Sequence, residues 1–278
     1  MTNESSKFKN IFTIYKKIIK KILSNIFLIS IFIKFKAKKN KNLVKYGTFA
    51  NGWEVFSKNL NQDSTIIAAG AGEDISFELE LVNKHESNCI IIDPTPRAKI
   101  HFNKIMKGKI FQKRVNYNQT GSKLIESYTL KSTNKKKFKF IDKALFDEDG
   151  KILKFYVPKV EKNVSHSLIL NPNIDQNNSI EVESITIANI INFYKIKNLE
   201  ILKLDIEGYE CEVIQQIIIK DKIFPKQICI EFDELGYLNF TIYKKIIETH
   251  SILIKNNYTI YKNLSTNNYT YLRSDLIN

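Results

Sequence analysis

A glycine-rich turn after a short apolar run is the first stretch of this sequence with the residue types to bind a ligand. Residues 65–69 are rich in β-branched and small apolar side chains, and Gly70, Ala71 and Gly72 follow them. Such a run suits a strand buried on both faces, and the turn lets a ligand approach the backbone closely. Asp93 ends a second apolar run 21 residues after Gly72, close to the spacing of about 20 at which an acid binds ribose hydroxyls. The pattern predicts a nucleoside site at the carboxyl edge of a parallel α/β sheet.

Two acids after the turn bear on the kind of ligand. A dinucleotide site uses Gly-x-Gly-x-x-Gly, whereas residues 70–75 read Gly-Ala-Gly-Glu-Asp-Ile, without the third glycine. Glu73 and Asp74 would repel a pyrophosphate, but they suit a cationic ligand such as S-adenosylmethionine, with its sulfonium and ammonium groups. We expect both acids to open the next helix, where they would complement its dipole. A structural turn with no ligand is the alternative, because a lone glycine turn is weak evidence.

Methyl transfer from a sulfonium to a hydroxyl needs aligned reactants and a base for the leaving proton. Asp205 follows a predicted buried strand at 199–204 and is our first candidate for that base or for a ligand of the acceptor hydroxyl. Glu207, Glu231 and His166 are candidates to assist. The alternatives are loop capping for the two glutamates and a solvated loop position for the histidine. The three acids also offer the oxygen ligands that Mg²⁺ prefers, although the sequence does not favour a metal site.

Apolar periodicity and turn signals divide residues 46–278 into alternating strands and helices. We predict strands at residues 65–69, 89–92, 138–146, 151–157, 180–186, 199–204, 227–232, 258–261 and 268–272. We predict helices from residue 73, from residue 96 behind a Thr95 cap, at 187–194, around 213–218 and at 238–254. Residues 107–137 are expected to form an irregular helix and a loop, 151–157 to pair back on 138–146, and 158–180 to form a long surface loop.

These elements indicate an α/β fold, a Rossmann-like seven-stranded methyltransferase sheet that is mostly parallel and ends in a C-terminal antiparallel hairpin. The chain of 278 residues is long enough for one such domain, at 46–278, and an N-terminal helical extension at 1–45. Cys89, Cys211 and Cys229 form no Cys-x-x-Cys motif, which predicts buried free thiols in a reducing compartment.

The N-terminal extension is strongly basic. It holds twelve lysines and one acid, Glu4, and so carries +11 of the net charge of +14. Its uncharged run at 22–33 has 12 residues, fewer than the about 20 that a spanning helix needs. No small-residue cleavage site follows that run, which argues against a cleaved signal peptide.

A basic, apolar helix of this kind can lie on an anionic membrane surface. We therefore expect a cytoplasmic protein, peripheral at the inner face of the cytoplasmic membrane. Packing of the extension on the domain or on a partner is the alternative. Nucleic acid is not an expected partner, because residues 1–45 contain no arginine and their aromatic residues do not interleave as a stacking platform requires.

Residues 46–273 resemble the FkbM-type S-adenosylmethionine-dependent methyltransferases. The resemblance rests on blocks in the same order, at residues 70–77, 93–96, 144–145, 202–208 and 228–232. It implies O-methylation, often of sugar hydroxyls, and hence a carbohydrate or glycan-precursor acceptor. It also implies an adenine contact near Ala144. The cofactor-binding residues expected in this way are Gly70, Ala71, Gly72, Glu73, Asp74, Asp93, Ala144 and Asp205.

One departure from the resemblance concerns the first strand. Many methyltransferases end that strand in an acid that holds the methionine ammonium, whereas this chain has Ala68 and Ala69 there. Glu73 and Asp74 are candidates to take over that role. If they do not, the alternative function is a non-catalytic, membrane-associated binding module on a degenerate methyltransferase fold.

Overall fold

The structure of the protein is a computed structural model that describes residues 15, 19, 42–48, 51–117, 122–160, 166–169, 173–232, 240–262 and 268–276. Most of the extension predicted at residues 1–45, with its apolar run at 22–33, lies outside these residues, as do 161–165 and 170–172 of the predicted long loop. Within the described part of the chain, no helix is both long and apolar enough to cross a bilayer.

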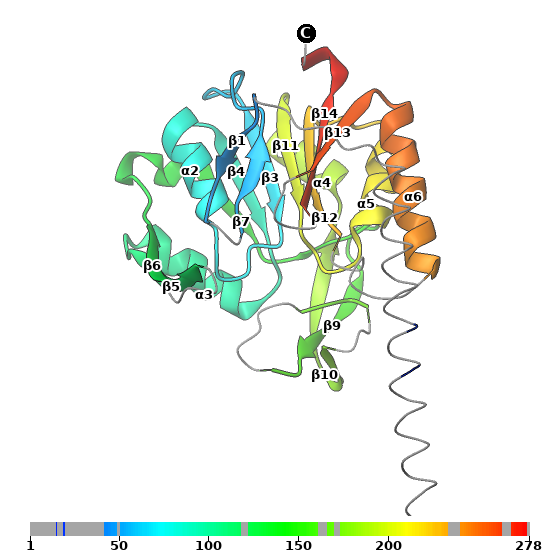
Figure 1. The fold of residues 1–278 in the computed structure, drawn as a ribbon, viewed down its shortest axis with the longest axis horizontal. Coiled ribbons are helices and arrows are strands. Elements are labelled where there is room, and N and C mark those ends of the chain that lie inside the picture. The colour runs from blue at the N-terminus through cyan, green and yellow to red at the C-terminus, as the bar shows by residue number, and fades with distance from the viewer. Residues whose placement is uncertain are drawn as a thin grey trace, which may run out of the picture.

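A mostly parallel sheet of seven strands forms the centre of the fold, in the order β13-β14-β12-β11-β3-β4-β7 (Figure 1). Strands β3, β4, β7, β11 and β12 run parallel, whereas β14 is antiparallel to both β12 and β13. The chain builds outward from β3 through β4 and β7, and then returns to the other side of β3 as β11 and β12. The strand order therefore reverses between β3 and β11. The bounds are β3 (Thr65–Ala69), β4 (Asn88–Ile92), β7 (Phe138–Ile141), β11 (Leu199–Leu204), β12 (Gln227–Glu231), β13 (Tyr258–Lys262) and β14 (Asn268–Arg273).

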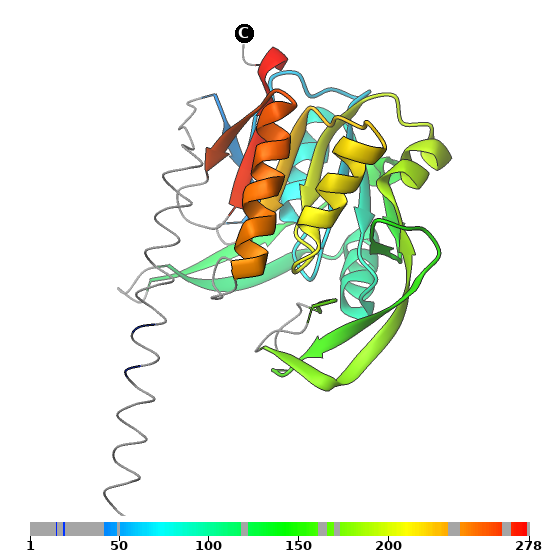
Figure 2. The ribbon, with the colours of Figure 1, turned by 90° about the vertical axis from the view of Figure 1, so that its right-hand side faces the viewer.

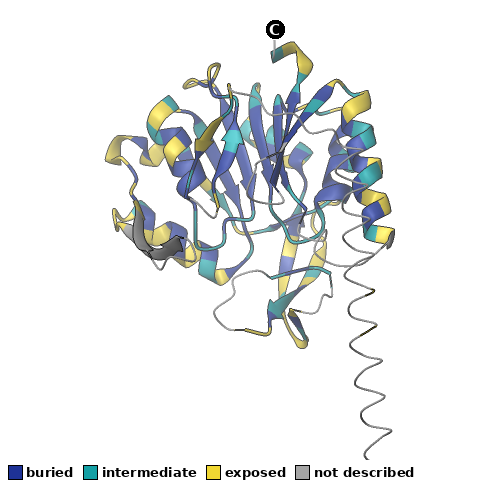
Figure 3. Cartoon of the chain, in the orientation of Figure 1, coloured by how far each residue is buried: buried dark blue, intermediate teal, exposed yellow. Residues whose placement is uncertain are grey.

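Helices cover both faces of this sheet (Figure 2). On one face α2 and α3 bury Phe77 and Phe102 in a core with Ile66 of β3. On the other face α4, α5 and α6 share a second core with Ile67. Every residue of β3 is buried, as expected for a parallel strand covered on both sides (Figure 3). The helices are α2 (Ser76–His85), α3 (Pro96–Met106), α4 (Ile187–Tyr194), α5 (Glu210–Gln215), which continues as a π-helical turn at Gln216–Lys220, and α6 (Phe240–Lys255).

Several local predictions are confirmed. The side chain of Thr95 accepts a hydrogen bond from the Ala98 N–H at 3.4 Å, and Pro96 opens α3, as the capping signal predicts. The three cysteines are free and buried. The strands at residues 65–69 and 199–204 and the helix at 187–194 have the predicted bounds.

The prediction for residues 107–137 is wrong. Instead of an irregular helix, β5 (Phe111–Tyr117) and β6 (Ser122–Tyr128) form an antiparallel pair, and a 3₁₀ turn follows at Ser132–Lys137. A second small pair joins β1 (Val44–Tyr46) to β2 (Trp53–Val55). Backbone pairing needs no alternation of apolar and polar side chains, so the polar sequence of β5 and β6 did not indicate strands.

The predicted pairing of residues 151–157 with 138–146 is also wrong. Strand β9 (Ile152–Pro158) pairs antiparallel with β10 (Ile174–Ile185), a longer strand than the one predicted at 180–186. The predicted strand at 138–146 is broken after Ile141, and β8 (Ala144–Leu145) pairs with the end of β10 instead. The long loop predicted at 158–180 therefore ends at residue 173. Local alternation identifies strands but not their partners.

Candidate functional site

The carboxyl ends of the parallel strands bring most of the predicted site residues to one edge of the sheet. Gly70 follows β3 and Asp205 follows β11, so these two residues stand on either side of the point where the strand order reverses. Asp93 and Asp142 follow the neighbouring strands β4 and β7, and Glu231 ends β12. Ligands of open α/β sheets bind in the crevice at such a reversal.

The turns after β3 and β11 touch each other through their backbones. Gly70 has a φ of +81°, and a Cβ atom there would lie 1.7 Å from the carbonyl oxygen of Asp205. The Asp205 N–H donates to the carbonyl of Ala69 at 3.2 Å, and the Gly70 N–H donates to Ile92 at 3.0 Å. No residue with a side chain fits at position 70, so this glycine is explained by the contact itself.

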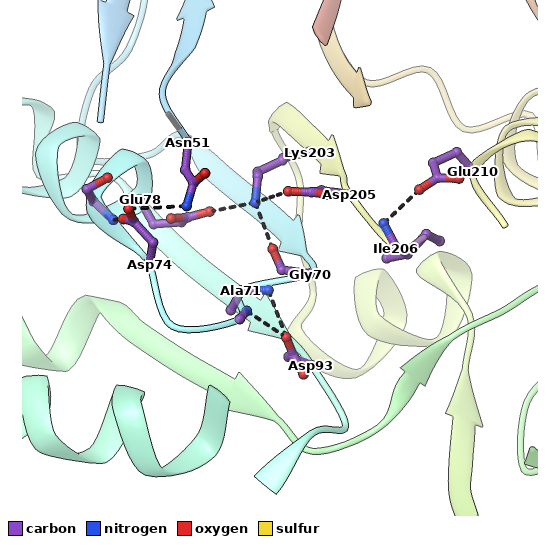
Figure 4. Close-up of polar contacts among 12 residues, drawn as sticks. Asn51, Gly70, Ala71, Asp74, Glu78, Asp93, Lys203, Asp205, Ile206 and Glu210 are labelled. Atoms are coloured by element: carbon purple, nitrogen blue, oxygen red, sulfur yellow. Dashed lines mark hydrogen bonds and ion pairs between the residues drawn. The ribbon is translucent and has the colours of Figure 1, made fainter. Parts of the chain in front are cut away.

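Asp93 holds the glycine turn in place. One carboxylate oxygen accepts hydrogen bonds from the Ala71 and Gly72 N–H groups at 2.8 and 2.9 Å (Figure 4). The other accepts from the N–H and the hydroxyl of Thr95 at 2.8 and 2.6 Å. Four donors occupy the roughly four lone-pair positions of a carboxylate, and the residue is only 5% exposed. The predicted ribose contact remains a prediction, and a ribose would have to displace some of these donors.

Glu73 and Asp74 lie before the helix that they were predicted to open, because α2 begins at Ser76. The Asp74 carboxylate accepts from the Ser76 N–H at 2.9 Å, a local bond that favours a turn over a helix. The same carboxylate accepts from the Thr48 hydroxyl at 2.8 Å. Glu73 pairs with Arg97 at 2.6 Å. Both acids are therefore bonded to protein groups beside the glycine turn.

A buried lysine beneath this edge was missed. The Lys203 Nζ donates to the Gly70 carbonyl at 2.7 Å and lies 3.5 Å from an Asp205 oxygen and 3.6 Å from Glu78 (Figure 4). Burial alone would lower the pKa of Lys203, but the charges of Glu78, Asp205 and Glu231 outweigh burial and raise it. The signal in the sequence was a lysine between Leu202 and Leu204 inside a strand predicted to be buried.

The loop after Asp205 is also braced by a side chain that the sequence did not single out. The Glu210 carboxylate accepts from the Ile206 and Gly208 N–H groups at 2.7 and 3.0 Å. Glu207 has a φ of +58°, a conformation uncommon for a residue with a side chain. Its carbonyl accepts a hydrogen bond from the Ser167 hydroxyl at 2.8 Å. An acid in the first turn of a helix was the signal for Glu210.

The remaining predicted site residues differ in how near they lie to the contact between Gly70 and Asp205. His166 precedes Ser167, so its segment reaches the Asp205 loop. Glu231 lies near enough to contribute to the charge around Lys203. Ala144 is fully buried in a cluster with Phe155 and Val182, so its side chain presents no surface for the predicted adenine contact. Among the described residues, no three His, Cys, Asp or Glu side chains gather as a metal site.

A cavity of about 420 Å³ lies apart from the glycine turn, between the end of β7 and α4. Its lining includes Ile141, Phe193 and Tyr194, but none of the residues at the Gly70–Asp205 contact. The chemistry of the carboxyl edge and its place at the strand reversal favour the site between the ends of β3 and β11 over this hollow.

The sequence matches the family model of the methyltransferase FkbM domain over residues 59–260, well over half of the chain. The match spans the sheet from β3 to the middle of β13. The comparison with curated proteins and the comparison with solved structures gave no match.

Replacing Asp93 by Asn should destabilise the protein with no ligand present. An amide has only one acceptor oxygen. Its NH₂ group would therefore face two of the donors that now bond to the second carboxylate oxygen of Asp93. We expect the free energy of unfolding in denaturant to fall by about 2–4 kcal/mol. The exposed Asp63 is the matched control, and Asp63→Asn should change it by less than about 0.5 kcal/mol. Equal stability of Asp93→Asn and the parent would show that Asp93 does not hold the turn.

Proposed function

Because the chain belongs to the FkbM methyltransferase family, we propose that it is an S-adenosylmethionine-dependent O-methyltransferase. We further propose that its acceptor is a sugar hydroxyl of a surface glycan or of a glycan precursor. The observation that carries the proposal is the row of acids at the carboxyl edge of the sheet, where Asp205 follows β11 beside the glycine turn of β3 and the strand order reverses. The acceptor class rests on the family resemblance alone.

The charges of this edge support a cationic cofactor. Acids stand in the glycine turn and at the ends of four parallel strands, where a pyrophosphate would be repelled. The backbone contact between Gly70 and Asp205 holds the two turns together, so a ligand at this edge would lie across both of them. When bound, the cofactor supplies an electrophilic methyl group. The residues that would hold it are the backbone of the glycine turn, Asp74, Asp93 and Asp205.

Asp205 is the residue best placed to handle the acceptor proton. Its side chain is 29% exposed, so a hydroxyl can reach it, and Lys203 fixes it from the buried side. The carboxylate would accept a hydrogen bond from the acceptor hydroxyl, orient its oxygen, and take the proton as the new bond to carbon forms. Base catalysis of this kind contributes about a hundredfold to ten-thousandfold, and alignment removes roughly 7–11 kcal/mol of barrier. Glu207, Glu231 and His166 are proposed to assist from the surrounding loops.

Calorimetric titration and product analysis test this function. The protein should bind S-adenosylmethionine and not NAD, and should form S-adenosylhomocysteine when a glycan extract is added. Asp205→Asn should lower that turnover by about a hundredfold to ten-thousandfold, because an amide cannot accept the proton. Asp63→Asn, at an exposed position, should leave turnover unchanged. Binding of NAD alone would refute the cofactor, and cofactor binding without turnover on any extract would favour the non-catalytic binding module.

We also propose that residues 1–45 attach the enzyme to the inner face of the cytoplasmic membrane, near lipid-linked acceptors. The twelve lysines support this, since each contributes about 1 kcal/mol near an anionic surface. Full-length protein should float with anionic lipid vesicles at low salt. A chain that starts at Asn42, and so keeps β1, should stay in the soluble fraction. If full-length protein also fails to float, the extension is a packing or oligomerisation element.

A further inference from the structure

Lys203 and Glu78 form a buried ion pair beneath the proposed site, and Glu78 has no part in the proposed chemistry. Lys203 and Glu78 are only 4% and 1% exposed, and their charged groups lie 3.6 Å apart. Neither oxygen of Glu78 has a hydrogen-bond partner among the described residues. Burial raises the pKa of Glu78, and the charge of Lys203 opposes that rise.

Such a pair contributes little to stability. Removing two charges from water costs several kcal/mol each, and well-packed apolar residues in the same place are often as stable or more stable. A carboxylate with no hydrogen-bond donor recovers that cost poorly. The pair therefore calls for an explanation in the site above it.

The position of the pair follows from the sheet. Lys203 of β11 is in register with Ala68 of β3, so both side chains leave the same face of the sheet. The small side chain of Ala68 leaves room beside the lysine, whose Nζ reaches the Gly70 carbonyl at 2.7 Å. Strand β3 therefore offers Lys203 no acid at this position. The acid beside the lysine is Glu78, which belongs to α2.

The lysine places a positive charge directly behind the crevice. Without a counter-charge, Lys203 would oppose Asp205 and weaken the attraction of this edge for a cation. With Glu78 ionised beside it, the pair has no net charge, and the negative charge of Asp205 acts on the ligand undiminished.

We propose that Glu78 cancels the charge of Lys203 so that the crevice favours the sulfonium cofactor over its uncharged thioether product. The inference rests on the proposed function, because it assumes that S-adenosylmethionine is the ligand. It makes Glu78 a residue that sets specificity between cofactor and product without touching either of them.

The ratio of two affinities measures this effect. S-adenosylmethionine and S-adenosylhomocysteine differ by one methyl group and one positive charge at sulfur, so the ratio of their dissociation constants reports the field in the crevice. Glu78→Gln removes one of the two carboxylates beside Lys203, while Asp205, 3.5 Å from its Nζ, remains. We expect the preference for S-adenosylmethionine to fall roughly five- to twentyfold.

The double variant Glu78→Gln/Lys203→Met restores a neutral pair. We expect it to recover the ratio of the parent to within about threefold, even if both ligands bind more weakly because the Gly70 carbonyl has lost its donor. Glu86→Gln, at the exposed end of the same helix, makes the same change in formal charge and should leave the ratio unchanged. Calorimetry gives both constants, and denaturant unfolding checks that each variant is folded. If Glu78→Gln does not fold, Glu78→Met carries the same expectation.

Two results would overturn the inference. One is an unchanged ratio in folded Glu78→Gln or Glu78→Met, and the other is an equal change in the double variant. If the parent binds neither ligand, the proposed function has failed, and the inference fails with it. If the parent binds both ligands but the ratio of dissociation constants in the variants does not change as expected, the proposed function stands. This inference alone is then refuted.

Discussion

The contact between the turns after β3 and β11 is the constraint on which the rest of the site depends. The two backbones approach so closely that a Cβ atom on Gly70 would lie 1.7 Å from the Asp205 carbonyl oxygen. Lys203 joins them from the buried side through its bond to the Gly70 carbonyl. Because the strand order reverses between these strands, the same contact lies where open α/β folds bind their ligands.

The acids around this contact have different tasks, although their sequence patterns look alike. Asp93 and Glu210 each bind backbone N–H groups and so determine the shape of the two turns. Asp205 has a partly exposed side chain and is open to a substrate. Glu78 is buried and acts, in our proposal, only through its charge. Exposure and hydrogen-bond occupancy separate these tasks, and spacing along the chain does not.

The features predicted correctly depend on neighbours in sequence. The buried run of β3, the Thr95 cap of α3 and the bounds of α4 each follow from composition within a few residues. The position of Asp93 at a strand end was found in the same way. Its bonding to the glycine turn was not, because the N–H groups that donate to it belong to the turn after the preceding strand, β3. The pairing of β9 with β10 and the meeting of Lys203 with Glu78 involve segments far apart in the chain. No local pattern encodes those contacts.

A crystal structure of the protein with S-adenosylhomocysteine tests the location of the site most directly. We expect the nucleoside at the carboxyl edge of the sheet, beside the Gly70–Gly72 turn and Asp205, with Lys203 still bonded to the Gly70 carbonyl. Binding of the ligand in the cavity beside Phe193 and Tyr194, with the glycine turn unoccupied, would contradict this location.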